Sequence, residues 1–518
     1  MREDIWSMIS ASLQKYENQV AWICRLEKGA ERRVSHAELY KAILNMAANL
    51  RESGVQKDTV VAVMAPNGPE WCTAALAVWK LGGIVAPVHI GNSQHEIESQ
   101  MEAIQPKLIL THQRTYSTQD LPIEMISTGP VNEREEELRE QFEPNDQALA
   151  IYTSGSTGTP KIVRLSHRNM TSNARAGAAF VSLDSNDRFL ALLPFSHAMG
   201  LTANLMLGLN AGGCLVAPRV LAAKEIVDAM KENQITILVA VPRLFRNIMI
   251  GLEKKFASGS PFLRAYIGLI RKSPLFLRRY LNAPIRKNLG GNLKCWLSGG
   301  SRLDPEIKQY YLDLGISLRQ GYGLTETSPA VAVQEHFDNV MDSVGKPLQD
   351  IEIRLVEKNA DGSGELQVRG PNIMLGYTDI AYTNEVMDGE WFSTGDLATL
   401  DADNRITLTG RKKRLIVTEA GKNIYPDELE TLLERDPRIK EAAVLEIDMR
   451  AAAILAIEAD DPQQIAREVL KSFNALVSTH NRIARFALIE ELPRTPLGKI
   501  ALHKLPQFFQ DNEVRKSQ

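Results

Sequence analysis

Apolar and polar positions alternate along the first 110 residues with two different periods. Behind Ser35, apolar side chains recur every three or four positions from 34 to 54, which predicts a capped helix. The uninterrupted apolar run at 60–64 predicts a buried strand. The same alternation continues with helices at 70–81 and 93–104 and with strands at 83–88 and 108–110. Strands that alternate with helices predict βαβ units and a parallel sheet.

The α/β pattern returns after a polar stretch and changes character twice more. Ser166 is placed to cap a helix that runs through residue 180. Short apolar runs predict further buried strands at 189–193, 213–217, 235–241 and 294–297, and another strand that ends at Arg319. From Gly345 polar and apolar residues alternate strictly, which predicts a small subdomain of antiparallel strands at about 345–410.

A second boundary is predicted near Gly410 and Arg411. Beyond it, helix patterns alternate with short apolar strands over roughly 100 residues, which is a compact α+β unit. We therefore expect an α/β protein with an N-terminal domain at 1–410 and a C-terminal domain at 411–518, with no carrier or partner domain fused behind it.

Composition excludes several classes of function. The chain has 518 residues and a net charge of −3, so nothing global indicates binding to nucleic acid. Its four cysteines are scattered without a C-x-x-C pair, as in a cytoplasmic protein with reduced thiols. The charged N-terminus lacks a signal-peptide core, and no apolar run reaches the ~18–20 residues of a membrane span. We expect a cytoplasmic protein that could lie peripherally on a membrane.

One polar loop carries the strongest chemical signal. Residues 151–161 read I-Y-T-S-G-S-T-G-T-P-K between two apolar, strand-like segments. Glycines free the backbone N–H groups, hydroxyls add donors and Lys161 adds a positive charge, which suits a polyphosphate. The lysine follows a proline and no helix opens there, so this is not the common G-x-x-x-x-G-K-[ST] loop. The loop taken alone could also be a solvated linker. The candidate phosphate-binding residues are Thr153, Ser154, Gly155, Ser156, Thr157 and Lys161.

Other polar segments follow predicted strands. The first ends in His197, which is either a structural hydrogen-bonding residue or a catalytic one. Glycines at 298–301 would let a flat ring lie against the backbone, and the carboxylate of Glu326 could bind Mg²⁺ beside a phosphate. Asp396 is expected after a strand, where it could accept two ribose hydroxyls. The remaining candidates are Gly299, Gly300, Ser301, Gln320, Gly321, Tyr322, Gly323, Thr325, Arg411, Gly421 and Lys499.

The segment 254–287 breaks the α/β pattern. It carries nine Lys or Arg and no Asp or Glu, interleaved with apolar residues. It could be a solvated helical pair with a packed underside, or a surface that meets an anionic membrane or an acidic partner such as an acyl carrier protein.

In this order, the motifs resemble those of the adenylate-forming superfamily, which includes acyl-CoA synthetases, peptide-synthetase adenylation domains and firefly-type luciferases. The resemblance spans residues 30–504 and is carried by the loop 152–161, the run 322–326, Thr394-Gly395-Asp396 and Gly498-Lys499. It implies a large N-terminal domain of layered α/β subdomains with a small β-barrel, and a mobile C-terminal domain beyond a hinge at Lys413.

The resemblance also implies roles for the candidates. The polar loop would hold the β- and γ-phosphates of ATP, and residues 299–301 would line the adenine slot with Tyr322 stacked on the base. Thr325 would contact the α-phosphate, Glu326 would bind Mg²⁺, and Asp396 and Arg411 would contact the ribose or phosphate. Lys499 would bridge the substrate carboxylate and the α-phosphate. Gly421 would line the tunnel for a thiol, either coenzyme A or the phosphopantetheine of a carrier protein.

The implied activity is the ATP-dependent conversion of a carboxylic acid to an acyl-adenylate and then to a thioester. Peptide-synthetase domains have an aspartate in the segment that matches 195–200, where this chain has Ser196-His197-Ala198. A substrate with an uncharged tail is therefore expected, and the stretch 410–430 resembles long-chain fatty acyl synthetases. We expect a medium- or long-chain fatty acid, with an aryl acid as the alternative.

Two features depart from the usual family pattern. Ala501 and Leu502 follow the Gly498-Lys499-Ile500 run before His503 and Lys504, and Lys413 stands where many relatives have an aspartate. Two other functions on the same scaffold are an oxygenase that oxidises the adenylate and a non-catalytic binding protein. The second would usually have lost Lys499 or Glu326, and this chain retains both.

Overall fold

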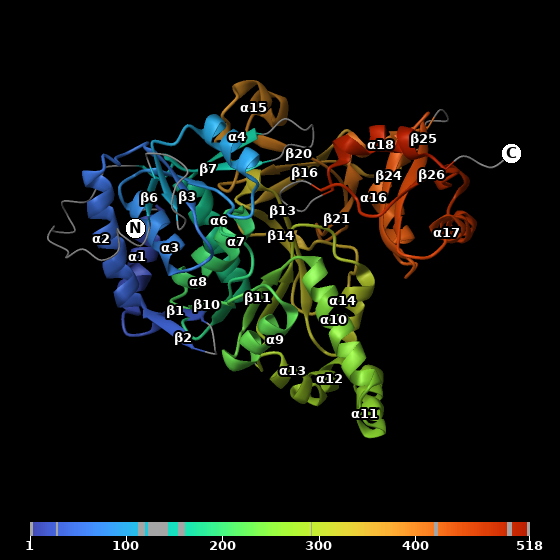
Figure 1. Cartoon of the computed structure of the whole chain (residues 1–518), viewed down its shortest axis with the longest axis horizontal. Coiled ribbons are helices and arrows are strands. Elements are labelled where there is room, and N and C mark those ends of the chain that lie inside the picture. The colour runs from blue at the N-terminus through green and yellow to red at the C-terminus, as the bar shows by residue number, and fades with distance from the viewer. Residues whose placement is uncertain are drawn as a thin grey trace.

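The computed structural model of this protein describes residues 4–26, 30–111, 120–122, 143–153, 161–291, 293–418, 423–494 and 500–514. A large N-terminal part holds two mixed sheets with interleaved helices, and a smaller C-terminal part lies at the right of Figure 1. This confirms the expected fold class, a large α/β domain followed by a small α+β domain. In the described part of the chain, no helix is long and apolar enough to cross a bilayer.

The N-terminal sheet has seven strands among the described residues, in the order β18-β8-β7-β4-β3-β5-β6. Its strands are β3 (Val60–Met64), β4 (Ile84–Pro87), β5 (Leu108–Thr111), β6 (Asp120–Pro122), β7 (Gln147–Thr153), β8 (Lys161–Ser166) and β18 (Gly376–Tyr377). Strands β3, β4, β5 and β7 are parallel, as their alternation with helices predicted. Strands β8 and β18 extend this sheet in the antiparallel direction: β8 pairs with β7, in line with the two strand-like segments predicted on either side of the polar loop, and β18 pairs with β8.

The central sheet has the order β15-β14-β13-β12-β11-β9-β10-β1-β2 within the described ranges. Its strands are β1 (Val20–Arg25), β2 (Glu31–Ser35), β9 (Arg188–Leu190), β10 (Cys214–Ala217), β11 (Ile237–Ala240), β12 (Cys295–Ser298), β13 (Leu318–Gly323), β14 (Ala330–Val333) and β15 (Lys346–Pro347). Two predicted strand ends are wrong. The strand at 189–193 ends at Leu190, and the strand expected to end at Arg319 continues to Gly323 because β14 pairs with its last three residues.

Helices fill the space between the two sheets. Helices α1 (Ile5–Lys15), α2 (His36–Glu52), α3 (Pro69–Lys80) and α6 (His167–Val181) share one hydrophobic core with strands of both sheets. The helix starts at Ser35 and Ser166 are confirmed, and α4 (Gln94–Ile104) likewise begins behind Ser93. Each serine side chain accepts a bond from the backbone of the third helical residue, whose own side chain bonds back to the serine N–H.

Further helices cover the opposite face of the central sheet. Helices α9 (Ala223–Glu232), α10 (Pro242–Ala257) and α14 (Pro305–Asp313) pack there in a second core. The segment 254–287 is not a helical pair. It contains the end of α10 and then α11 (Pro261–Lys272), α12 (Leu275–Leu281) and α13 (Ala283–Asn288). Prolines at 261, 274 and 284 interrupt the helical hydrogen bonding and divide the segment.

The last two units follow in chain order. Strands β16 (Glu352–Val356), β17 (Gly364–Arg369), β19 (Met387–Asp388), β20 (Trp391–Leu400) and β21 (Ile406–Arg411) form an antiparallel sheet flanked by α15 (Ile380–Val386). The C-terminal part contains β22 (Ile416–Val417), β23 (Asn423–Ile424), α16 (Pro426–Leu433), β24 (Ile439–Ile447), β25 (Arg450–Ile457), α17 (Pro462–Leu476), β26 (Arg485–Ile489) and α18 (Leu505–Asn512). It has its own apolar cores.

Candidate functional site

Two neighbouring strands of the central sheet place the glycine-rich segments side by side. Strands β12 and β13 are parallel with Ser298 opposite Gln320, so Gly299, just beyond β12, and Gly321 and Tyr322, where β13 extends past β12, lie at the same edge. A Cβ on Gly299 would lie 2.7 Å from Met199 Sδ, so a larger residue at this position would require the Met199 side chain to move. The Ser298 hydroxyl is buried and finds no hydrogen-bond partner among the described residues. This edge therefore combines a glycine close to the Met199 side chain with an unused buried hydroxyl.

A buried carboxylate, that of Asp396, contacts Tyr322 at this edge. The Tyr322 hydroxyl donates to Asp396 Oδ2 at 2.6 Å, and Arg411 Nε contacts Asp396 Oδ1 at 2.7 Å. The prediction that Asp396 follows a strand is wrong, because it lies inside β20 and pairs with Arg411 of β21. Gly395 with φ +70° precedes it, and the register of the ladder shifts just after it. Burial raises the pKa of the Asp396 carboxyl, and Arg411 and the Tyr322 hydroxyl offset part of that rise.

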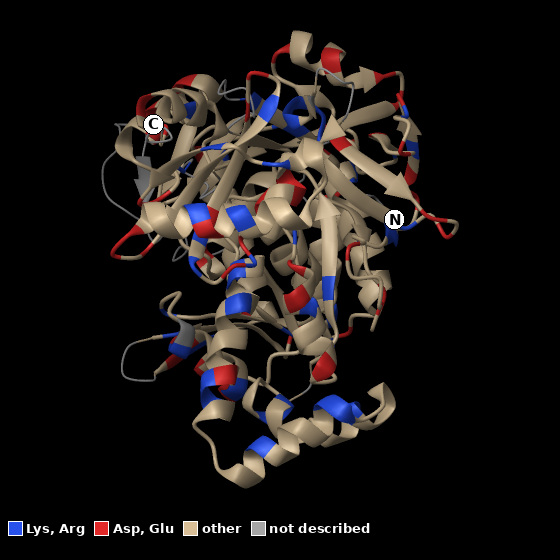
Figure 2. Cartoon of the chain, turned by 90° about the vertical axis from the view of Figure 1, so that its right-hand side faces the viewer, with Lys and Arg blue, Asp and Glu red and all other residues tan. Residues whose placement is uncertain are grey.

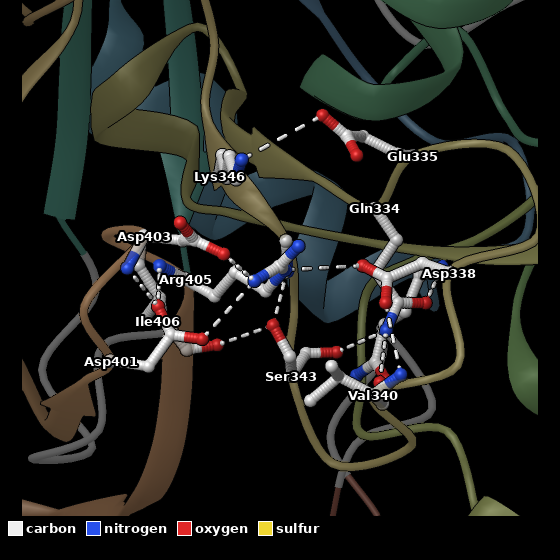
Figure 3. Close-up of polar contacts among 12 residues, drawn as sticks. Gln334, Glu335, Asp338, Val340, Ser343, Lys346, Asp401, Asp403, Arg405 and Ile406 are labelled. Carbon is white, nitrogen blue, oxygen red and sulfur yellow. Dashed lines mark hydrogen bonds and ion pairs between the residues drawn. The ribbon is translucent and has the colours of Figure 1, made fainter.

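A second network supports these strands from behind (Figure 3). The Gln334 side chain accepts from the Gln320 N–H at 2.9 Å and donates to the carbonyls of Val340 and Ser343. The Ser343 hydroxyl in turn donates to the Ile406 carbonyl at 3.2 Å. These bonds connect β13, which carries Tyr322, to β21, which carries Arg411. The positions of the aromatic ring and the guanidinium are thereby coupled.

The acidic residue of the next turn faces the ends of the polar loop. Glu326 lies in the 3-10 turn η4 (Thr325–Thr327), and its Oε1 accepts from the Tyr377 hydroxyl at 2.8 Å. The Lys161 ammonium lies 4.8 Å from the Tyr377 ring centre and 3.9 Å from that of Tyr382. Thr153 is opposite Lys161, to whose carbonyl its hydroxyl donates at 3.3 Å. One carboxylate, one ammonium and one hydroxyl thus lie around Tyr377.

This arrangement fits a magnesium nucleotide. Mg²⁺ is usually bound by one or two carboxylates together with phosphate oxygens and water, so a single carboxylate such as that of Glu326 would be enough as the protein ligand. Within the described residues, no group of three or more His, Cys, Asp or Glu side chains could hold a metal by itself. Burial and the nearby Glu326 carboxylate also raise the pKa of the Tyr377 hydroxyl, which stays a proton donor to that carboxylate.

Gly323 fixes the turn that carries Thr325 and Glu326. A Cβ at this position would lie 1.8 Å from the Pro329 carbonyl oxygen, which accepts the Leu324 N–H at 3.0 Å. Because the obstacle is backbone, a side chain can enter only if the turn moves.

We expect Gly323→Ala to lower kcat/KM for ATP by about tenfold or more, since a misplaced carboxylate and hydroxyl lose their alignment. Initial rates at varied ATP concentration measure this, and Gly251→Ala is the matched control because nothing lies within 4 Å of a Cβ there. Equal activity of the two variants would show that the turn tolerates displacement and that its geometry does not matter.

The segment with His197 lies where the two large sheets meet. His197 precedes the short helix α7 (Ala198–Gly200), and its ring centre is 5.8 Å from that of His89, which follows β4. His89 Nδ1 also lies 3.4 Å from the Ser196 hydroxyl. Burial lowers the pKa of His89, so this imidazole is neutral near pH 7. Met199, two residues after His197, brings its sulfur close to Gly299.

A π-helix continues from this segment and reaches the Glu326 turn. The element η3 (Leu201–Met206) is a π-helix, a rare form that is frequent at functional sites. Its Thr202 hydroxyl donates to the Ser328 carbonyl at 3.2 Å, just beyond η4. Asn204 is fully buried, and neither of its amide atoms has a partner within the part of the chain that the structure describes. The segment that follows His197 is therefore bonded to the backbone beside the Glu326 turn.

The connection between the two domains has a fixed point on each side. Lys412 contacts the carboxylates of Glu357 and Glu365 in the large domain, at 2.5 and 2.7 Å. Arg414 pairs with Asp427 and Glu430 in the small domain. The exposed residue between these two anchors, in η5 (Lys412–Arg414), is Lys413.

Several candidates lie outside the described residues. They are Ser154, Gly155, Ser156, Thr157, Gly421 and Lys499. Among the other candidates, Tyr322, Asp396 and Arg411 form one contact group, Glu326, Lys161 and Thr153 lie in a second group around Tyr377, and His197 lies beside His89. Ser301 and Gly300 are exposed at the end of β12, and Gly300 adopts φ +84°. Sequence reasoning missed Tyr377 and His89, because neither lies in a motif-like run, and each reaches the site from a strand distant in sequence.

Comparisons with known proteins identify a family. A family model described as "AMP-binding enzyme" matches residues 9–378. A long-chain-fatty-acid–CoA ligase of Mycobacterium bovis is 27% identical over 472 residues, which cover 81% of this chain and 76% of that protein. A 2-succinylbenzoate–CoA ligase of Bacillus cereus is 26% identical over 495 residues, which cover 93% of this chain and 95% of that protein.

Solved structures share the fold over almost the full length. The o-succinylbenzoate CoA synthetase of Bacillus subtilis, in complex with its acyl-adenylate intermediate, superposes with a TM-score of 0.80 at 24% identity. ATP-bound MatB of Rhodopseudomonas palustris has a TM-score of 0.81 at 21% identity. In each case 99% of both chains is covered.

Proposed function

The chain belongs to the AMP-binding enzyme family, and we propose that it is an acid–thiol ligase that converts a carboxylic acid and ATP to an acyl-adenylate and then to a thioester. The observation that carries this proposal is the pair of clusters Tyr322–Asp396–Arg411 and Glu326–Tyr377–Lys161 at one edge of the sheets. One supplies an aromatic face with a ribose acceptor, and the other supplies a carboxylate and an ammonium for phosphates.

Each described residue takes a role that its surroundings support. Asp396 has lone pairs beyond those used by Tyr322 and Arg411, which can accept ribose hydroxyls. The close approach at Gly299 and the unpaired Ser298 hydroxyl suit a planar base edge-on to the strand ends. Thr325 and Glu326 lie one residue apart on η4, so a phosphate contact and a metal contact would be made from the same turn.

The chemical difficulty is the approach of two anions. A carboxylate oxygen must attack the α-phosphorus, forming the acyl–phosphate bond and expelling pyrophosphate. Mg²⁺ at Glu326 would supply charge neutralisation and hold the leaving phosphates. Lys161 and the hydroxyl-rich loop would position the β- and γ-phosphates, and Lys499 would neutralise the encounter between the carboxylate and the α-phosphate.

The second step, thioester formation, needs a different surface of the C-terminal domain to face the adenylate. A thiolate attacks the acyl carbonyl carbon and AMP leaves with the bridging oxygen, so the positive charge of Lys499 is no longer required. We propose that the C-terminal domain, residues 411–518, turns about Lys413 between the steps and brings Gly421 to the thiol channel. The anchors at Lys412 and Arg414 support this pivot, because they hold the two flanking residues to different domains. The thiol would be coenzyme A or a carrier-protein phosphopantetheine.

The acid is proposed to be a medium- or long-chain fatty acid. Support comes from the similarity to a long-chain-fatty-acid–CoA ligase and from the absence of a carboxylate in the run 195–200. The alternative is an aryl acid, which the 2-succinylbenzoate–CoA ligases favour. The His89–His197 pair and the Ser196 hydroxyl favour the aryl-acid alternative, because these groups could bind a polar substituent of a small acid.

A pyrophosphate-release screen over straight-chain acids of increasing length, benzoate and 2-succinylbenzoate tests this. We expect the highest kcat/KM with acids longer than about eight carbons, since each buried methylene adds ~0.8 kcal/mol of transfer free energy. If kcat/KM is highest with an aryl acid, the substrate is an aryl acid and not a fatty acid, and the proposed ligase activity still holds. If no acid gives pyrophosphate under conditions where Mg-ATP binds, the proposal that the protein is an acid–thiol ligase is wrong.

A further inference from the structure

We propose that helices α11 and α12 dock this protein on an anionic lipid surface. We call this region the α11–α12 surface, and define it by six exposed apolar side chains, which are Phe262, Leu269, Leu275, Phe276, Leu277 and Tyr280. The inference concerns a surface outside the candidate site and does not depend on which acid the site accepts.

The apolar side chains on these helices are unusually open to solvent. Phe262 is 88% exposed, Phe276 is 68% exposed and Tyr280 is 78% exposed. Among the described residues of α12, none is buried, so packing inside the molecule does not explain its apolar character. Phe276 and Tyr280 are four positions apart and therefore lie on one face of the helix.

Helix α11 has two apolar stripes with different partners. Leu263, Ile267 and Ile270 form the inner stripe and pack in the core beneath the central sheet. Phe262 and Leu269, seven positions apart, form an outer stripe that points to solvent. The inner stripe is enough to pack α11 against its own domain. The exposed outer stripe therefore indicates contact with something outside the molecule.

Charge indicates what that partner is. The segment 254–287 holds nine basic residues and no acidic one, although the whole chain carries a net charge of −3. Arg271 and Arg278 pair with Glu253 and Asp313 inside the domain, whereas Arg264 and Lys272 of α11 are exposed. Helix α11 thus carries exposed cations together with the exposed ring of Phe262, which matches a surface with anionic headgroups above an apolar interior.

The shape of this region favours a bilayer over other occupants. In Figure 1, α11 projects beyond the body of the large domain, and Figure 2 shows Lys and Arg along these lowest helices. A second copy of the chain would bring two basic surfaces together, which costs free energy. An acidic protein would satisfy the charges, but a projecting surface with rings 68–88% exposed is shaped to enter an interface rather than to receive a side chain.

Apolar contact and charge should act together. A few exposed rings or a few cations alone bind membranes weakly, while the two signals combined give stable association. Binding should therefore require both anionic lipid and intact rings, and it should weaken with added salt.

Flotation of the full-length protein with vesicles tests the proposal. Vesicles of phosphatidylcholine with about 30% phosphatidylglycerol should carry the protein upward, and vesicles of phosphatidylcholine alone should not. We expect Phe262→Ser combined with Phe276→Ser, and separately Arg264→Glu combined with Lys272→Glu, to reduce the floated fraction by roughly tenfold.

The matched control is Leu476→Ser, which removes an apolar side chain that is 87% exposed at the end of α17, away from this surface. It should float like the unmodified protein. Pyrophosphate release without vesicles and the melting temperature should be unchanged in all variants, which separates docking from folding and from the activity. Failure of the unmodified protein to float with anionic vesicles would overturn the proposal. So would flotation that survives both double substitutions, or binding to an acidic carrier protein in place of lipid.

Discussion

Replacing Lys499 with alanine should slow acyl-adenylate formation by at least about 10²–10³-fold, the cost of removing one electrostatic contact to a transition state. The reaction brings two anions together, and Lys499 is the positive group assigned to the acyl carboxylate and the α-phosphate. Pyrophosphate release in a single turnover, with enzyme in excess, measures this step without interference from thioester release.

Two comparisons make the Lys499→Ala result specific. Thioester formation from a chemically prepared acyl-adenylate and the thiol should remain close to that of the unmodified enzyme, because that step needs no charge at this position. Lys504→Ala, an exposed lysine five positions later, should retain adenylation. Equal loss in both half-reactions would indicate damage to the domain, and full adenylation by the variant would disprove the assigned role.

The second large effect is expected at Asp396. Asp396→Ala should raise KM for ATP by roughly 10–100-fold, because hydrogen bonds to a charged group contribute about 1.5–3 kcal/mol. The change removes the proposed ribose acceptor and leaves the Tyr322 hydroxyl and the Arg411 guanidinium without their shared partner. Isothermal titration with ATP and initial rates at varied ATP both measure the loss.

The control for Asp396 is Asp388→Ala, in the adjacent strand β19. The Asp388 side chain is 71% exposed and pairs with Arg354 at the surface, so its removal should leave nucleotide binding unchanged. If Asp396→Ala binds ATP like the unmodified protein while keeping its melting temperature, the carboxylate does not contact the nucleotide.

Patterns of neighbouring residues predicted the helix starts and the buried strands correctly where the determining contacts are local. Ser35, Ser93 and Ser166 mark helix starts by themselves, because a capping bond involves residues only three positions apart. The predicted strands at 60–64 and 213–217 are present as β3 and β10. A short run of consecutive apolar residues indicates a strand that is buried on both faces, and this signal is local. These features depend on neighbours in the chain.

The errors arose where the determining contact is distant in sequence. Gly321 and Tyr322 are in a strand because β14 pairs with them, and nothing before Arg319 reveals that partner. Asp396 lies within a strand because Arg411 is opposite it across the ladder. Tyr377 reaches Glu326 through a two-residue strand that pairs with β8, which no periodicity in the sequence could indicate.

In the candidate site, too, the sequence motifs revealed the residues in local runs but not the distant residues that hold them in place. The glycine, hydroxyl and carboxylate runs were visible as motifs, and the structure brings those that it describes to one edge. What the motifs lacked was the support around them, such as the Gln334 network behind β13 and the imidazole of His89 beside His197. A residue that acts by positioning another has no composition signal of its own.

The central claim is that a carboxylate oxygen attacks the α-phosphorus of ATP, and isotope transfer tests it most directly. The preferred acid, labelled with ¹⁸O in both carboxylate oxygens, is converted with ATP, Mg²⁺ and coenzyme A, and the products are weighed by mass spectrometry. We predict that AMP carries one ¹⁸O atom and that pyrophosphate carries none, because the bridging oxygen of the adenylate leaves with AMP. Unlabelled AMP, or ADP with labelled orthophosphate, would contradict the account.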